Sequence, residues 1–293
     1  MEYEIILYYK YTPIADAKKL WQEQKEITKK LGLTGRLIIA SEGINGTLEG
    51  TKENIDAYCK DLLCREGFED IVIKRSAGDG KAFPKLKVKL RNEIVSSHLG
   101  EEDVKPYDLT GKYLSADELH SWYEKGEDFV VIDMRNTYEY KIGRFEGSLD
   151  AGLANFRDLK ERVKDFEPLK KKKILTVCTG GVRCEKASGY LVSKGFEDVY
   201  QLQDGIVTYM AKYPNKAFKG KLYVFDNRIA MDFDDPSNHT VVGKCDLCDT
   251  PTEHYVNCKN VRCNKHFLAC DTCFEEKDGF CSALCREVVM QKA

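Results

Sequence analysis

The chain has 293 residues, of which 42% are hydrophobic, so it is long enough for two or three domains with their own cores. A formal net charge of −2 excludes a global attraction to nucleic acid or membrane, so any such contact must come from a local patch. The chain shows no signal peptide and no run of about 18 apolar residues, which predicts a cytoplasmic protein without a membrane span. Because thiols stay reduced in that compartment, twelve cysteines indicate metal binding and catalysis rather than disulfides.

Residues 1–95 are predicted to form a ferredoxin-like (acylphosphatase-like) domain. Hydrophobic periodicity predicts a strand at 2–11, a helix at 16–32, a hairpin at 36–50, a helix at 52–67, and strands at 71–75 and 85–91. This order of strand, helix, strand, strand, helix and strand is the ferredoxin-like one. Asn45 and Gly46 are expected near the turn of the hairpin, because an Asn-Gly pair favours a tight turn.

The strand at 85–91 has one apolar face and one basic face. Its cationic side chains alternate with leucine and valine, and they are Lys85, Lys87, Lys89 and Arg91. Two interpretations of this basic stripe stay open. The stripe can contact the phosphates of RNA, or its lysines can protect an edge strand from pairing with another sheet.

Residues 96–112 lack sustained periodicity and are interpreted as a linker, after which residues 113–215 alternate between helix and strand. Helices are predicted at 116–126, 156–166 and 185–195, with Ser115 as the cap of the first, and strands at 129–135, 174–178 and 198–202. This alternation is typical of an α/β domain with a parallel sheet. Cys178 then lies at the carboxyl end of a strand, where such sheets usually bind ligands.

The segment CTGGVRC, residues 178–184, joins that strand to the next helix. The helix N-terminus and Arg183 supply positive potential, so Cys178 is predicted to be a thiolate and a nucleophile. Arg183 follows the cysteine by five residues, one fewer than in cysteine phosphatases, which favours persulfide or related sulfur chemistry over phosphate ester hydrolysis. The loop residues between them, whose amides can converge on the sulfur, are Thr179, Gly180, Gly181 and Val182.

Two alternatives to this interpretation of the loop stay open. Cys178 can instead be a buried structural cysteine. Cys184 either resolves an oxidised Cys178 or is a small residue that packs the first turn of the helix.

Residues 216–293 form a cysteine-rich segment that is predicted to bind zinc. Eight thiolates in closely spaced pairs suit two structural sites with four ligands each, and the metal would supply much of the folding energy. His254 and His266 can replace a cysteine or lie beside the sites. Disulfides and an iron–sulfur cluster are the competing interpretations. The eight cysteines are Cys245, Cys248, Cys258, Cys263, Cys270, Cys273, Cys281 and Cys285.

Residues 113–213 resemble the rhodanese domain family. The similarity rests on YLSADEL, on VVIDMRNTYEY with Asp133, Arg135 and Glu139, on GRFEGS and on CTGGVRC. The resemblance implies that Cys178 carries a persulfide. Arg144 and Phe145 depart from the usual His-Ile of that family, which affects only a loop contact.

Further segments extend the resemblance to nearly the whole chain. They are SEGINGT (41–47), FPKLKVKLRNEIV (83–95), VFDNRIA (224–230) and the cysteine-rich end. Together they are similar to the bacterial tRNA uridine hydroxylase family, whose members join a ferredoxin-like domain to a rhodanese domain and a Cys-rich end. The resemblance implies oxygen-dependent conversion of the wobble uridine, position 34 of certain tRNAs, to 5-hydroxyuridine, with Cys178 required and the anticodon loop as the partner.

In this interpretation Cys178 forms an adduct with C6 of uracil or becomes an oxidised sulfur species, and Arg183 and the loop amides stabilise the negative charge. Two other functions stay open. One is a sulfurtransferase that passes sulfur from a persulfide on Cys178 to another thiol, in which case a sulfur donor or a reductant protein is a further partner. The other is a non-enzymatic adaptor that binds RNA or protein.

Overall fold

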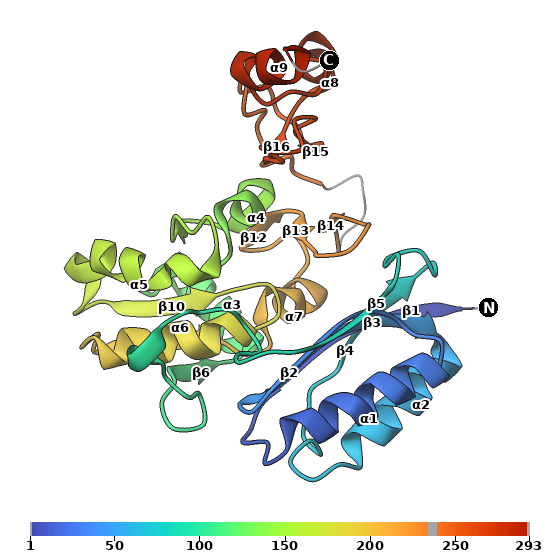
Figure 1. Ribbon diagram of the computed structural model, residues 1–293. Helices are drawn as coiled ribbons and strands as arrows, with labels where there is room; N and C mark the ends of the chain where they lie inside the picture. Colours follow the sequence, from blue (N-terminus) through green and yellow to red (C-terminus); the bar gives the residue numbers. More distant parts are fainter. Residues whose placement is uncertain (1, 234–238, 292–293) are drawn as a thin grey trace.

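The computed structural model of the protein describes residues 2–233 and 239–291. It contains an N-terminal domain, a central domain, and a C-terminal segment that ends in a small module standing apart from the rest (Figure 1). The predicted fold class is confirmed, since an antiparallel α+β domain precedes an α/β domain with a parallel sheet and a cysteine-rich end. No helix in this part of the chain is long and apolar enough to cross a membrane.

The N-terminal domain is a five-stranded sheet with two helices on one face (Figure 1). The strand order is β4-β1-β3-β2-β5, so β5 is added to a ferredoxin-like arrangement of the first four strands. The helices begin at side-chain caps, because Asp16 accepts a hydrogen bond from the Lys19 amide and Thr51 accepts one from the Asn54 amide. The elements are β1 Tyr3–Tyr11, α1 Ala17–Lys30, β2 Thr34–Ala40, β3 Gly43–Thr51, α2 Lys52–Leu63, β4 Lys74–Gly78 and β5 Leu86–Leu90.

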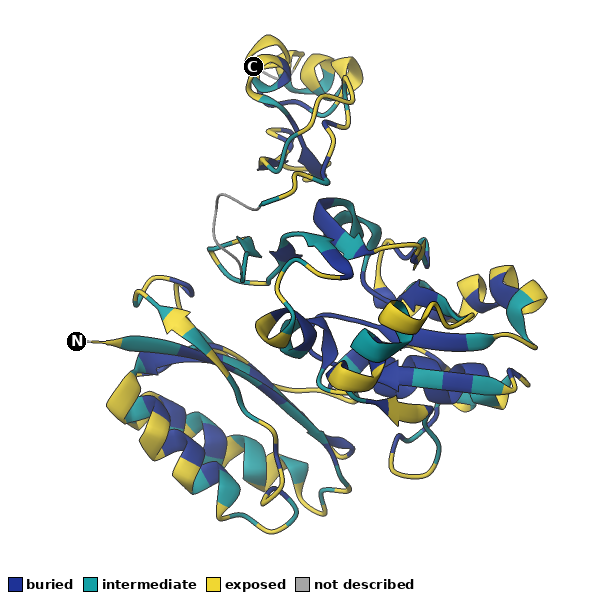
Figure 2. Ribbon diagram, turned by 180° about the vertical axis from the view of Figure 1, so that it is seen from behind, coloured by how far each residue is buried: buried dark blue, intermediate teal, exposed yellow. Residues whose placement is uncertain are grey.

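The two faces of this sheet have different neighbours. Ile6 and Tyr8 of β1 and Leu37 of β2 belong to the core under α1 and α2, and Figure 2 shows the exposed residues of both helices turned outward. Because side chains alternate along a strand, Leu7 and Tyr9 point the other way. Both lie against the loop after Cys178, so the helix-free face of the sheet meets the central domain.

The hairpin turn lies at Ser41 and Glu42, so its expected place near Asn45 and Gly46 is wrong. Asn45 and Gly46 lie inside β3, where they pair with β1 and β2. Gly46 is required there for packing, because a Cβ atom on it would lie 2.5 Å from the ring of Tyr8. The Asn-Gly pair therefore serves a close approach between strands rather than a turn.

Strand β5 is an edge strand that runs parallel to β2. Its apolar side chains, Leu86 and Val88, pack toward the core under the helices, and the Trp21 indole donates a hydrogen bond to the Val88 carbonyl. The register pairs Lys87 with Arg36 and Lys89 with Ile38. The basic stripe is therefore exposed on the helix-free face of the sheet, at its edge.

The central domain is a parallel five-stranded sheet, ordered β6-β11-β10-β7-β9, with helices on its faces (Figure 1). Helix α3 begins at Ser115, whose side chain accepts a hydrogen bond from the Glu118 amide. The elements are β6 Lys112–Leu114, α3 Ala116–Lys125, β7 Val130–Asp133, α4 Thr137–Ile142, β8 Gly143–Phe145, β9 Leu149–Asp150, α5 Leu159–Arg162, β10 Lys173–Val177, α6 Val182–Ser193, β11 Asp198–Leu202 and α7 Gly205–Lys212.

Two predicted helices of this domain differ in the structure. The segment 156–166 holds only the four-residue helix α5 between 3₁₀ turns at Phe156–Asp158 and Val163–Leu169. Helix α6 begins at Val182 instead of residue 185, because Gly181 at φ +102° allows the chain to turn sharply from β10. The first turn of α6 therefore includes Arg183 and Cys184.

The remaining segments join the domains together. Residues 96–112 are packed rather than loose, since Leu99 and Val104 lie in the core of the central domain. Strand β12 (Phe218–Gly220) pairs with β8, so the C-terminal segment begins on the central domain. It continues through β13 Leu222–Tyr223, β14 Ala230–Met231, β15 Tyr255–Asn257, β16 His266–Leu268, α8 Asp271–Glu276 and α9 Ala283–Met290.

Candidate active site and metal centres

Cys178 follows β10 directly and faces the N-terminus of α6. The Gly181 amide donates a hydrogen bond of 3.2 Å to its Sγ. Thr179 is buried, and Gly180 and Val182 line the same cavity as the cysteine. The backbone of the loop therefore surrounds the sulfur, and the two glycines of the loop permit this close approach.

The surroundings favour the thiolate of Cys178. Burial alone would raise its pKa, but a hydrogen bond from the Cys184 thiol, the charge of Arg183, and the Cys184 and Arg183 amides lower that pKa to about 6. Burial and the neighbouring sulfur raise the pKa of Cys184 well above its usual range. At neutral pH, Cys178 is therefore the thiolate and Cys184 the thiol that hydrogen-bonds to it.

Arg183 is held by a buried carboxylate. Its two terminal nitrogens lie 2.6 Å and 2.9 Å from the two carboxylate oxygens of Glu139, in a bidentate pair. A second buried pair, Arg135 with Asp133, adjoins it, because the Arg135 guanidinium donates to the Glu139 carbonyl at 3.2 Å and to the Gly143 carbonyl at 2.6 Å. Because Glu139 occupies the guanidinium fork, Arg183 acts on the sulfur through its charge and its amide rather than by binding a substrate phosphate.

The N-terminal domain supplies contacts to this loop that the sequence interpretation missed. The Tyr9 hydroxyl donates to Glu185 at 3.0 Å, and burial raises the pKa of Tyr9 so that the hydroxyl stays protonated. The Tyr11 hydroxyl donates to the Val182 carbonyl at 3.2 Å. Lys74 donates to the Gly180 carbonyl at 3.2 Å and lies 3.0 Å from Asp204. Only the continuous apolar and aromatic run from Ile5 to Tyr9 could have indicated that β1 has a partner on both faces.

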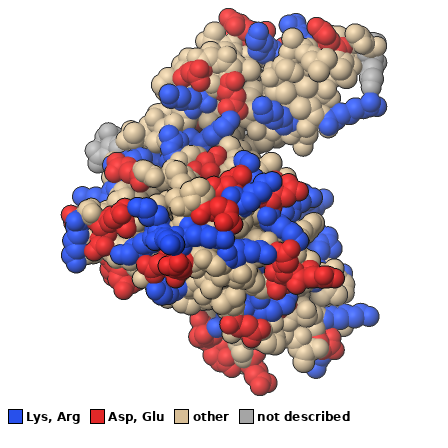
Figure 3. Space-filling model, turned by 90° about the vertical axis from the view of Figure 1, so that its left-hand side faces the viewer, with Lys and Arg blue, Asp and Glu red and all other residues tan. Residues whose placement is uncertain are grey.

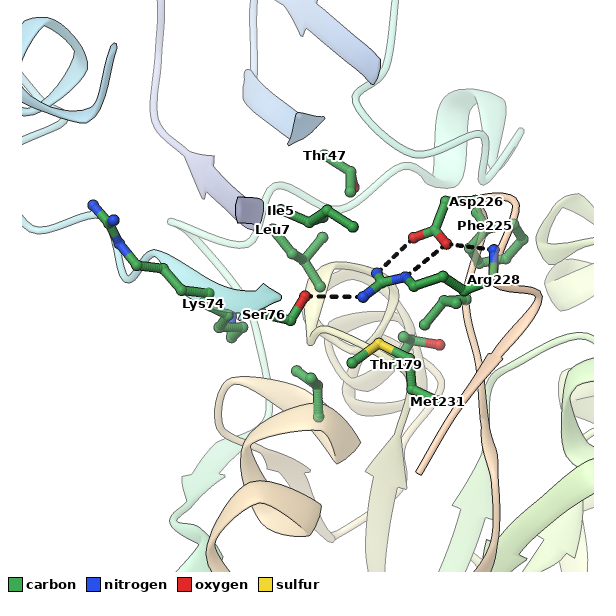
Figure 4. A pocket seen from close by; sticks show the side chains of 13 residues that line it. Ile5, Leu7, Thr47, Lys74, Ser76, Thr179, Phe225, Asp226, Arg228 and Met231 are labelled. Atoms are coloured by element: carbon green, nitrogen blue, oxygen red, sulfur yellow. Dashed lines mark hydrogen bonds and ion pairs between the residues drawn. The ribbon is translucent and has the colours of Figure 1, made fainter. Parts of the chain in front are cut away.

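The two domains enclose a cavity of about 310 Å³ beside Cys178. The central domain contributes Cys178 and its loop, and the helix-free sheet face contributes Asn45 and Arg36. A smaller cavity of about 70 Å³ adjoins it, and Figure 4 shows Leu7, Thr47 and Phe225 at its wall, with Arg228 bound to Asp226 and Ser76. The VFDNRIA segment thus closes one side of the site.

The eight C-terminal cysteines form two groups of four. Within each group the sulfur atoms lie within 4.8 Å of one another. The sulfur pairs Cys248–Cys270 and Cys263–Cys281 are 3.6 Å apart, close to the roughly 3.8 Å edge of a tetrahedron with Zn–S bonds of about 2.3 Å. The groups interleave along the chain, one holding Cys245, Cys248, Cys270 and Cys273 and the other Cys258, Cys263, Cys281 and Cys285.

The two histidines lie outside these groups. His266 stacks on Tyr255 and is hydrogen-bonded to Asn257 at 2.8 Å and to the Tyr223 hydroxyl at 3.2 Å. His254 lies 3.6 Å from Asp271. Sulfur atoms alone therefore make up both sets of potential ligands.

Three family models match successive parts of the chain. Residues 3–94 match the UPF0176 acylphosphatase like domain, residues 115–212 the Rhodanese-like domain, and residues 219–286 the Rhodanase C-terminal family.

Proteins with the name tRNA uridine(34) hydroxylase are similar over nearly the full length. The chain is 45% identical to the one from Bacillus pumilus over 289 residues, which cover 97% of this chain and 88% of that protein. It is 43% identical to the Staphylococcus aureus protein over 288 residues, with 97% and 90% covered. The Cytophaga hutchinsonii protein is 42% identical over 285 residues, again with 97% and 90% covered.

Proposed function

This chain belongs to the tRNA uridine(34) hydroxylase family, and we propose that it hydroxylates uridine 34 of tRNA at C5, with O2 as co-substrate and Cys178 as the reactive group. One observation carries the proposal. Cys178 is a thiolate at neutral pH in the wall of a cavity of about 310 Å³, a volume suited to a single base and its sugar. An anticodon loop can extend one base into such a pocket at low cost, because its bases are not paired.

The thiolate has a defined role in this reaction. It adds to C6 of uracil, and the electrons of the C5–C6 double bond move to C5 and O4 as an enolate. One atom of O2 is then bonded to C5, while the other leaves as water with two electrons from a reductant and two protons. Loss of the C5 proton and of the Cys178 thiolate restores the double bond in 5-hydroxyuridine. Arg183 and the amides around the sulfur stabilise the anion that leaves.

A sulfurtransferase is the second candidate, because the charge and amides that stabilise a thiolate would also stabilise a persulfide on Cys178. The burial of the cysteine favours the hydroxylase. Cys178 is 0% exposed, and Leu7 and Tyr9 of the N-terminal domain lie against its loop. A reactant must therefore reach the sulfur through the cavity between the two domains, whose volume of about 310 Å³ suits a single extended base better than the surface of another protein.

The basic stripe of β5 is our candidate for phosphate contacts. Lys87 adjoins Arg36, which lines the cavity, so positive charge runs from the sheet edge into the pocket. Within the described chain, none of the stripe residues forms an ion pair. In contrast, Lys and Arg on the face in Figure 3 lie among Asp and Glu. Lysines of the central domain form ion pairs, such as Lys170–Glu167 and Lys173–Glu127.

The two groups of cysteines are proposed to hold structural zinc. Four cysteine sulfurs at tetrahedral spacing leave no open position, which is typical of a site that stabilises a fold and does not catalyse. When bound, the metal would cross-link the strands and helices of the C-terminal module.

The test is nucleoside mass spectrometry of tRNA from cells that lack the gene. Complementation with the wild type should restore 5-hydroxyuridine, and Cys178→Ser should leave at least about 10³-fold less product, because the nucleophile is gone. Cys64→Ser, which changes an exposed cysteine of the N-terminal domain, is the matched control. Unchanged 5-hydroxyuridine in the deletion strain would refute the hydroxylase, and loss of a thiolated nucleoside instead would establish the sulfurtransferase.

A further inference from the structure

The helix-free face of the N-terminal sheet forms one wall of the Cys178 cavity. Strand register sets its side chains in two rows. Leu7, Thr47 and Arg36 form the first row, and Tyr9, Asn45 and Ile38 form the second. All six line the cavity, and neighbouring strands are about 4.8 Å apart. Asn45 lies in the central strand β3, with a strand bonded on each side, so its backbone is fixed.

The amide of Asn45 has only one orientation. Its Nδ2 donates a hydrogen bond of 3.0 Å to the Ile94 carbonyl, which can only accept. Ile94 is itself fixed, because its amide donates to the buried carboxylate of Glu42 at 2.9 Å. Two segments singled out in the sequence, SEGINGT and FPKLKVKLRNEIV, thus meet to hold one side chain.

The other end of this amide is free to act on a ligand. Asn45 Oδ1 has no hydrogen-bond partner within the described residues, and it is not among the buried unsatisfied atoms. Because Asn45 lines the cavity, this oxygen is an acceptor that opens into it. Arg183, by contrast, has both terminal nitrogens bonded to Glu139, and one of them also to the Thr179 hydroxyl.

The shape of uracil fits these two walls. C6, the atom that Cys178 attacks, and N3 are at opposite corners of the ring. A thiolate adds to C6 along the face of the ring, so a uracil that lies over Cys178 keeps its N3 edge in the plane of the ring, where that edge can meet the strand wall that Asn45 lines. Uracil carries a hydrogen on N3, whereas N3 of cytosine is a lone-pair acceptor that a fixed carbonyl oxygen repels.

We propose that Asn45 is the specificity-determining residue of the site and accepts a hydrogen bond from N3–H of the uracil that lies over Cys178. The proposal rests on the proposed function. It explains how the pocket admits uracil and excludes cytosine, because a buried acceptor left against another acceptor weakens binding by about 10- to 100-fold. A base with N3 blocked is excluded for the same reason, and also by the bulk of the blocking group.

The test measures the affinity of the full-length protein for an anticodon stem-loop with uridine, 3-methyluridine or cytidine at position 34. The wild type should bind the uridine form about 10- to 100-fold more tightly than the other two. Asn45→Ala should lose that preference, because the acceptor is gone and a methyl group fits in its place. Asn54→Ala, the same change on α2 behind the other face of the sheet, should keep it.

Asn45→Asp extends the test, because it keeps an acceptor oxygen but loses the amide that binds Ile94. This variant should still exclude 3-methyluridine, and thermal melting verifies that each variant is folded. Wild-type discrimination in Asn45→Ala, or acceptance of 3-methyluridine by Asn45→Asp, would overturn the proposal.

The same variants expressed in cells separate this proposal from the proposed function. If the wild type forms no 5-hydroxyuridine, the proposed function fails whatever Asn45 does. If the wild type forms it and Asn45→Ala forms as much with unchanged selectivity, only the role of Asn45 fails.

Discussion

Cysteine has two different environments in this protein. Cys178 is 0% exposed, and its negative charge is stabilised by the backbone, Arg183 and the Cys184 thiol. The C-terminal cysteines range from buried to exposed, and their sulfur atoms gather in fours. The comparison shows that the neighbours of a thiolate decide what it does. A single sulfur in a fixed field of donors can react, whereas four sulfurs at tetrahedral spacing suit a closed metal site.

The largest expected effect is the loss of one metal site, which distinguishes the C-terminal cysteines from Cys178. Cys273→Ser should lower the zinc content from about two to about one per chain and unfold much of the C-terminal module, since a structural zinc site contributes about 10 kcal/mol or more. Metal analysis and limited proteolysis measure this. Cys178→Ser should keep both metal ions, and a metal-free wild type with a protease-resistant module would refute the assignment.

Loss of the buried ion pair should have the next largest effect. Glu139→Gln leaves the Arg183 guanidinium buried without a counter-charge and should lower the free energy of unfolding by about 3 kcal/mol, as measured in denaturant. The control is Asp165→Asn, which breaks the exposed pair with Arg162 and should cost less than about 1 kcal/mol. Equal losses in the free energy of unfolding for the two substitutions would show that burial does not strengthen the Arg183–Glu139 ion pair.

The pH dependence of alkylation tests the thiolate itself. Because the pKa of Cys178 is lowered to about 6, the thiolate is present above that pH and is lost below it. The rate of modification by iodoacetamide, followed by mass spectrometry of the Cys178 peptide, should rise about tenfold from pH 5 to pH 7 and then level off. The unfolded chain is the reference. Its thiols have a pKa of about 8.5, so their rate of alkylation should keep rising up to about that pH. A rate that still rises at pH 8 in the folded protein would contradict the lowered pKa.

The smallest expected effect is on the affinity for the tRNA substrate. Lys87→Gln removes one charge next to Arg36 and should weaken tRNA binding about fourfold at physiological salt, with a salt-dependence slope smaller by about 0.7. Lys29→Gln, at the end of α1 on the other side of the sheet, should change neither value. An unchanged slope in Lys87→Gln would leave protection of the edge strand as the role of the stripe.

Local patterns in the sequence predicted most of the elements. A cysteine between a β-branched run and a helix, with two glycines after it, is a signal contained in a few consecutive residues. The eight C-terminal cysteines likewise predicted metal binding by their number and spacing. The division into two interleaved groups could not be predicted, because Cys248 and Cys270 meet only when the strands between them pair.

The sequence predicted the residues on only one side of the site. Cys178 and Arg183 were predicted from adjacent residues, whereas Asn45 was expected near a turn and Tyr9 was not singled out at all. Both lie on the helix-free face of a sheet, and whether such a face meets solvent or another domain depends on how two domains dock. The sequence by itself determined the thiolate and its loop, because those depend on local backbone; only the tertiary structure decided what faces the thiolate, because that wall comes from strands more than 130 residues away in the chain.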